Sequence, residues 1–183
     1  MNRRDMLGSA AAALAVAAIP FGAEANEATD RIDRDVSNAL ANLYRKSPGA
    51  RALSKNAKGI LTFPRIVKAG LMVGAQSGRG ALRKHGHTTG YYRTTGVSYG
   101  LQAGAQSFGY ALFFMTTDAV RYLERSRGWE IGSGPSVVVA DEGIAGSLTT
   151  TSARSDVYAF IFDQSGLMAG LGIQGSKITR INP

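Results

Sequence analysis

The sequence contains no cysteine among its 183 residues. Without thiols the chain forms no disulfide, offers no thiolate nucleophile or metal ligand, and carries no lipid on cysteine. Histidine is also scarce, since His85 and His87 are the only two in the chain. These shortages leave little from which nucleophilic or metal-dependent catalysis is built.

Acidic residues are missing from a long internal stretch, because none occurs between Asp35 and Asp118. The same stretch holds many lysines and arginines, and the whole chain has a formal net charge of +8. A field of one sign attracts an anionic partner, which is nucleic acid, acidic lipid or an acidic protein. The alternative is that the charge only keeps a basic protein soluble.

Residues 1–25 have the features of an export leader. Arg3-Arg4 is followed by an apolar stretch over residues 6–19, and Ala23-Glu24-Ala25 is a small-x-small cleavage signal. The apolar stretch is too short for a convincing membrane span. The paired arginines favour twin-arginine export, with an ordinary secretory leader as the alternative. We therefore predict a mature domain over residues 26–183 that is periplasmic or secreted.

Two helices are predicted to open this domain. Residues 26–44 carry one apolar stripe at helical spacing, formed by Ile32, Val36, Leu40 and Leu43. A shorter helix follows to about residue 56, with Ser47 as its cap and Pro48 at its first position. We expect the stripe to pack on the domain's own sheet, and the alternative is that it lies on a membrane.

Residues 57–82 form a glycine-rich block around which the rest of the chain is arranged. An apolar run over residues 60–63 precedes an expected turn at Pro64-Arg65. From Leu71 the side chains alternate as in a strand, and Ser77-Gly78 is interpreted as the next turn. The glycines suit bends and close backbone approach in a curved sheet.

The remaining pattern is mostly β. Strands are predicted at residues 97–105, 110–115, 137–139 and 157–162. The last three are expected to be buried on both faces. The strand at 157–162 is expected to form a hairpin with residues 166–174. One helix is expected at 117–127, capped by Thr117-Asp118, with Val120 and Leu123 inward. Strands come in runs instead of alternating with helices, which predicts a single α+β domain. Its sheet is expected to be mainly antiparallel and strongly curved, as a partial barrel.

Several motifs that are typical of known chemistry lack the sequence context that this chemistry requires. The run from Gly170 through Gly172 to Gly175 spells a dinucleotide fingerprint but ends eight residues before the last residue, where no βαβ unit fits. His85 and His87 would share a face on a strand and could seat a metal, but they lie in a glycine- and lysine-bounded turn without a carboxylate nearby, so an exposed loop is expected instead. The serines at 133 and 136 lack the spacing of a nucleophile elbow. We predict no enzymatic activity, no metal and no cofactor.

What remains is a basic, glycine-rich surface with apolar and aromatic neighbours, namely Phe63, Met72, Tyr91 and Tyr92. Cations attract an acidic headgroup, while aromatic and apolar side chains settle at the water–acyl boundary. RNA uses similar contacts, but the export leader and the lack of any nucleic-acid signature argue against it.

The glycine-rich block and two later motifs resemble the SYLF domain, a lipid-binding module also found in yeast actin regulators. The first matching segment contains Gly59-Ile60, Phe63-Pro64, Lys68-Ala69-Gly70, Val73-Gly74 and Gly78-Arg79-Gly80. The others are Ser98-Tyr99-Gly100-Leu101-Gln102-Ala103-Gly104 and Ser165-Gly166-Leu167-Met168-Ala169-Gly170. Matches extend over about residues 39–181 and occur in the family's order.

The resemblance implies a non-enzymatic α+β module that binds phosphoinositides and other acidic phospholipids, and actin in some eukaryotic members. It implies headgroup contacts at Lys58, Arg65, Lys68 and Arg79. The sequence departs from the family at Tyr91-Tyr92, where many members have Trp, and in having a leader where inserting members have an amphipathic helix. The alternative is a cell-envelope structural or interaction protein that binds an acidic polymer or protein partner.

Overall fold

The computed structural model describes residues 21–71, 73–99, 104–140, 155–166, 173 and 175–183. Its helices are α1 (Phe21–Lys46), α2 (Pro48–Ser54) and α3 (Thr117–Arg125). Its strands are β1 (Gly59–Leu71), β2 (Val73–Lys84), β3 (His87–Tyr99), β4 (Gly104–Phe114), β5 (Trp129–Glu130), β6 (Val137–Ala140), β7 (Val157–Gly166) and β8 (Lys177–Ile181). Within this described part, no helix is long and apolar enough to cross a membrane.

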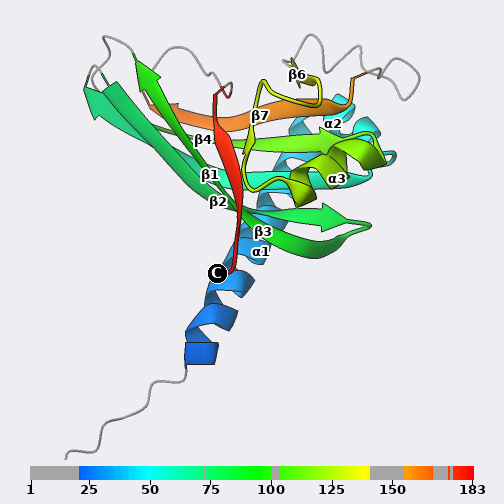
Figure 1. The fold of residues 1–183 in the computed structure, drawn as a ribbon, viewed down its shortest axis with the longest axis horizontal. Coiled ribbons are helices and arrows are strands. Elements are labelled where there is room, and N and C mark those ends of the chain that lie inside the picture. The colour runs from blue at the N-terminus through cyan, green and yellow to red at the C-terminus, as the bar shows by residue number, and fades with distance from the viewer. Residues whose placement is uncertain (1–20, 72, 100–103, 141–154, 167–172, 174) are drawn as a thin grey trace, which may run out of the picture.

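All eight strands join one sheet in the order β5-β8-β3-β2-β1-β4-β7-β6. Every pairing is antiparallel except that of β6 with β7. The sheet curls into a half-barrel, with α3 in front of it and α1 passing behind it (Figure 1). The predicted α+β fold with a curved, mainly antiparallel sheet is confirmed.

The inner face of the half-barrel holds the larger apolar core. Trp129, Phe63 and Tyr110 are buried there beneath α3. Val120 and Leu123 point into this core, as the helical spacing predicts. The cap of α3 is Thr116, one residue earlier than expected, and its side chain accepts a hydrogen bond from the amide of Ala119.

The outer face is covered at one end by α1 and α2. The predicted stripe of α1 is buried against sheet residues that include Ala81 and Phe113, which confirms that this helix packs on its own sheet. The helix begins at Phe21, five residues earlier than expected, and so includes the last residues of the predicted leader. Ser47 caps α2 as predicted, by accepting a hydrogen bond from the amide of Ala50.

Neither turn expected in the glycine-rich block is formed. Strand β1 continues through Pro64, where its register against β2 shifts between Thr62 and Arg65. Such a bulge leaves a residue out of the ladder, so a proline without an amide hydrogen is tolerated there. Gly78 lies inside β2, where an added Cβ would meet the carbonyl oxygen of Arg65 at 2.7 Å. Gly78 therefore allows β1 and β2 to approach closely, and the chain does not turn there.

The strand predicted over residues 97–105 is wrong as one element. Strand β3 ends at Tyr99 and β4 begins at Gly104, and β2 and β1 lie between these two strands in the sheet. An alternating pattern is the same on both sides of a reversal, so periodicity alone does not reveal it.

Two further strand predictions need correction or lie outside the description. Strand β6 is an edge strand, and Val139 in it is 40% exposed, so this segment is not of the buried type. The valines are half-covered because only β7 flanks them. Strand β7 runs on to Gly166, whereas most of the predicted partner strand over 166–174 lies outside the described residues.

Irregularities occur at one level across three neighbouring strands. The register of β1 shifts against β4 between Phe63 and Ile66, as it does against β2. The register of β4 against β7 shifts between Ser107 and Gly109. On β7, Asp163 adopts a φ of 49°, in the left-handed region. These sites separate the part of the sheet under the helices from the part that extends beyond them.

Candidate anion-binding surface

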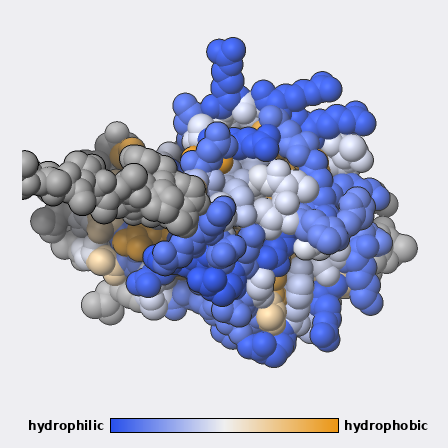
Figure 2. Space-filling view, turned by 90° about the horizontal axis from the view of Figure 1, so that it is seen from below, coloured by the Kyte–Doolittle hydropathy of each residue, from blue (hydrophilic) through white to orange (hydrophobic). Residues whose placement is uncertain are grey.

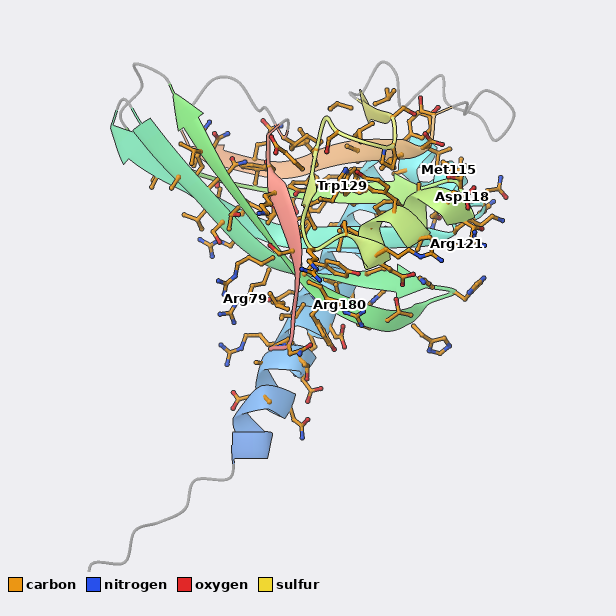
Figure 3. The ribbon with its side chains drawn as sticks, viewed as in Figure 1. Arg79, Met115, Asp118, Arg121, Trp129 and Arg180 are labelled. Atoms are coloured by element: carbon orange, nitrogen blue, oxygen red, sulfur yellow. The ribbon has the colours of Figure 1, made fainter. Side chains whose placement is uncertain are left out.

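Three arginines form a row across three adjacent strands. Arg65 on β1 lies opposite Arg79 on β2, and Arg79 lies opposite Arg93 on β3. All three are exposed. Partners in an antiparallel pair have Cα atoms about 4.5–5.5 Å apart, so three positive charges leave the sheet side by side. We call this set the arginine row; Figure 3 shows Arg79 projecting from the sheet, away from Trp129 in the interior.

Strand alternation and the bulge place the row on the outer face. In β2, Gln76 points inward and is buried, whereas Ser77 and Arg79 are exposed. If the register found before the bulge continued along β1, Pro64 would lie opposite Arg79. The extra residue in β1 shifts the register by one and brings Arg65 to that position.

The charges of the row are not compensated within the described residues. The four ion pairs found there are Arg31–Glu27, Lys46–Asp163, Lys84–Glu124 and Arg121–Asp118. None includes a member of the row. Like charges directly opposite each other destabilise a sheet. An arrangement that costs stability and lacks its own counterions is suited to an external anion.

Exposed apolar side chains continue the same face beyond the row. Val67 is 48% exposed and Val97 is 64% exposed. The register places Val97 opposite Ala75, which in turn lies opposite Ala69. Figure 2 shows a hydrophobic patch on the left of a largely hydrophilic surface, the side to which the long strands extend in Figure 1. The outer face is thus cationic near α1 and apolar farther out.

Of the four headgroup contacts predicted from sequence, two come together. Arg65 and Arg79 are direct partners in the row. Lys68 is half-buried on the opposite face. Lys58 is exposed before β1, with its amide bonded to the carbonyl of Phe114. Seven residues separate it from Arg65, which is roughly 23 Å along a strand.

Lys68 lies in a polar cluster on the inner face. Its Cα partners on the neighbouring strands are Gln76 and Gln106, and both glutamines are buried. Gln76 donates a hydrogen bond from Nε2 to Oγ of Ser176 at 2.8 Å. The sheet itself therefore separates Lys68 from the arginine row.

Arg93 is the member of the row that sequence reasoning does not single out. Arg79 and Arg93 are partners because β2 and β3 form a hairpin around His85 and Gly86 and because their register shifts by one residue between Leu82 and Arg83. Counting back from the turn without this shift pairs Arg79 with Tyr92, so the turn alone does not predict the row. The turn expected at Ser77-Gly78 further hides the pairing of Arg79 with Arg93.

The aromatic neighbours expected at the surface are mostly buried. Phe63 and Tyr92 lie in the inner core with exposures of 0% and 1%. Tyr91 is half-buried and donates a hydrogen bond to Oδ2 of Asp33 on α1 at 2.9 Å. Burial and the Asp33 carboxylate raise the pKa of Tyr91. Met72 lies outside the described residues, so the apolar part of the described surface is formed by valine and alanine.

The expected exposed turn is found at His85, whereas His87 already belongs to a strand. His85 lies in the β2–β3 turn with a φ of 50°, and His87 begins β3. Both are exposed. Among the residues that the structure describes, no three histidine, aspartate or glutamate side chains gather as a metal site would require.

Comparison with known proteins gives one match. Residues 95–182 match the family model described as Ysc84, a Las17-binding protein actin regulator. This range runs from the end of β3 to the end of the chain, so it includes Val97 but not the arginine row. No curated protein matches the sequence.

Proposed function

Because the chain belongs to the SYLF domain family, we propose that it docks on acidic phospholipid surfaces through the arginine row. Membership indicates binding of the lipid or actin-regulator type. The choice of an acidic lipid as ligand rests on the surface described above. The proposed function is binding without a chemical step.

The observation that carries the proposal is the alignment of Arg65, Arg79 and Arg93 as direct strand partners. A flat membrane surface contacts many headgroups at once, and a row of exposed guanidinium groups matches it. Guanidinium binds phosphate with two parallel hydrogen bonds. Each cation near an anionic leaflet contributes about 1 kcal/mol. Three together contribute about 3 kcal/mol, which is roughly a hundredfold in affinity.

The apolar end of the surface supports the same orientation. Val67 lies two residues beyond Arg65 on β1, and Val97 lies four residues beyond Arg93 on β3, on the same face of the sheet. With the arginines at headgroup level, these side chains reach the acyl boundary. The valines then supply a part of the affinity that salt does not screen.

Export from the cytoplasm is part of the proposal. Removal of the predicted leader, residues 1–25, takes away the first five residues of α1. The buried stripe that the structure describes in that helix begins at Ile32, so these described core contacts remain in the shortened chain. The expected ligand is therefore the outer surface of a membrane facing the periplasm or the exterior.

Co-sedimentation with vesicles tests the proposal. The chain should sediment with vesicles containing phosphatidylglycerol and stay in solution with phosphatidylcholine alone. Arg79→Glu combined with Arg93→Glu should weaken binding by more than about tenfold, because two attractions become repulsions. The matched control is Arg125→Glu with Arg127→Glu, which reverses two exposed charges near the end of α3.

Equal losses in both pairs would mean that net charge alone governs binding. Unchanged binding after reversal of Arg79 and Arg93 would exclude the row as the lipid site. Absence of binding to both kinds of vesicle would favour the alternative function, in which the same surface binds an acidic polymer or protein.

A further inference from the structure

A second site lies at the other end of the outer face, between the helices and the β2–β3 turn. It is a cleft of about 460 Å³ formed by α1, α2, the start of β1 and the end of β2. That volume is within the range of small-molecule sites. Its lining includes Leu40, Ala41 and Tyr44 on α1, Lys55 after α2, Ile60 on β1 and Arg83 on β2.

The chemistry of the lining is divided between a floor and a rim. Leu40, Tyr44 and Ile60 supply apolar surface, and the two latter side chains are only half-buried. Lys55 and Arg83 supply positive charge, whereas no aspartate or glutamate lines the cleft. The site therefore combines apolar contact area with unopposed cations.

Arg83 is the residue that indicates a missing partner. One of its Nη atoms donates to the backbone carbonyl of Asp33 at 2.9 Å and to Oγ of Ser37 at 2.8 Å. Its Nε is buried and has no acceptor. None of the four ion pairs in the described part of the chain includes it. A half-buried cation held only by neutral acceptors lacks the counterion that burial normally requires.

Asp33, whose backbone carbonyl holds Arg83, has its carboxylate bonded to other residues. The carboxylate of Asp33 accepts hydrogen bonds from Thr88 at 2.7 Å and from Tyr91 at 2.9 Å. These bonds fix α1 to β3 and leave the guanidinium of Arg83 without a carboxylate partner. The cleft is thus pre-organised, because both its cation and the helix that bears its apolar floor are held in place.

We propose that this cleft binds a small amphipathic anion, a carboxylate or phosphate monoester with a medium-length apolar tail, whose head meets Arg83 and whose tail lies on Tyr44 and Ile60. The anion neutralises the positive charge of Arg83, and the tail covers apolar surface that water otherwise contacts. A free fatty acid and a lipid-derived phosphate share this chemistry. The inference is independent of the arginine row, because Arg83 lies beyond the buried Ala81 on β2.

Calorimetric titration of the whole chain tests the site with three probes of equal tail length. Nonanoate and octyl phosphate carry the two kinds of head on an alkyl tail of the same length, and 1-octanol carries no charge. We expect one saturable site per chain for at least one anion. The tighter of the two identifies the head as carboxylate or phosphate. We expect 1-octanol to bind at least about tenfold more weakly, a difference of about 1.4 kcal/mol.

Two variants and a matched control locate the binding. Arg83→Gln removes the charge, and Ala41→Trp fills the cleft from an exposed position on α1 without touching the bonds of Arg83. Each should weaken binding of the anion by about tenfold or more. Asn38→Trp places the same bulk at an exposed position of α1 outside the cleft and should leave binding unchanged.

Several outcomes would overturn the proposal. One is the absence of saturable binding by both anions. Another is unchanged affinity in Ala41→Trp, which would place the ligand elsewhere. Equal affinity for 1-octanol would remove the role of Arg83. If Arg83→Gln melts at a much lower temperature than the unchanged chain, Ala41→Trp alone decides the location.

Discussion

Arg79 and Arg93 face each other across β2 and β3 as direct strand partners, with both side chains exposed. Oppositely placed charges of one sign oppose folding, whereas a bound anion removes that repulsion. The pair thus links the stability of the sheet to the occupation of its surface.

This relationship predicts opposite effects on folding and on binding. Arg93→Thr should raise the free energy of unfolding by roughly 0.2–1 kcal/mol, because it removes a like-charge pair and introduces a strand-forming residue. The same variant should bind acidic vesicles several times more weakly. Urea denaturation and co-sedimentation measure the two effects, with Arg125→Thr on α3 as control. A destabilised Arg93→Thr would instead make this arginine a structural residue.

The exposed valines predict a component of membrane binding that survives salt. Exposed charges are screened beyond about 8 Å at physiological ionic strength and beyond about 3 Å at 1 M. Binding to phosphatidylglycerol vesicles should therefore fall as salt rises and then level off. Val97→Asp should abolish the remainder, because it places a carboxylate at the acyl boundary. Val139→Asp, at the exposed edge strand β6, is the control and should retain it.

Close packing of β1 on β2 predicts a steep cost for one methyl group. A Cβ at Gly80 would lie 2.0 Å from the carbonyl oxygen of Thr62 and 2.8 Å from Cδ1 of Phe63. Gly80→Ala should therefore lower the free energy of unfolding by about 3 kcal/mol, as in an overpacked core. Gly86→Ala meets nothing within 4 Å but has a φ of +83°. It should cost only about 1–2 kcal/mol, the price of a left-handed alanine. Equal losses in the two variants would contradict the steric explanation.

The buried tyrosines predict weakening of the fold at alkaline pH. Tyr110 is fully buried and donates to Oγ1 of Thr94 at 2.9 Å, and burial raises its pKa. Above the ordinary pKa of about 10, the unfolded chain releases this proton while the folded chain retains it. Stability is then complete below pH 10 and falls above it, by up to about 1.4 kcal/mol per pH unit for each such tyrosine.

Comparison with Tyr110→Phe isolates this contribution. The variant should be less stable at pH 8, since Thr94 loses its partner, but its stability should fall less steeply between pH 10 and 11. Guanidinium denaturation at several pH values measures both. Parallel curves for the two proteins would show that Tyr110 does not carry the pH dependence.

The helices were predictable because their signals are local. The residues of the stripe from Ile32 to Leu43 recur every three or four positions, and Ser47 caps the helix that follows it directly. The structure has both features. The inward positions of Val120 and Leu123 follow from the same spacing. Such features need no knowledge of distant partners.

The surface was predictable only in part, because it depends on register between strands. The absence of acidic residues located the basic region, and Arg65 and Arg79 lie in the row. Arg65 and Lys68 lie on opposite faces of β1. The bulge near Pro64, which adds one residue to β1, decides that Arg65 and not Lys68 shares the face of Arg79. Arg93 enters the row through the hairpin around His85 and Gly86 and through a one-residue register shift beside it, which the sequence pattern does not mark. Composition gives the charge of a region, whereas the sheet decides which charges meet.

The irregularities that cross β1, β4 and β7 act together as a crease. Each leaves its ladder with an interrupted bond pattern at the same level, so the sheet resists bending least along that line. Arg65 stands at the crease, with the helices on one side and Val67 on the other. Bending along it would tilt the outer parts of β1, β4 and β7 relative to the part of the sheet under the helices. The crease would therefore let a rigid core rest on surfaces of different curvature.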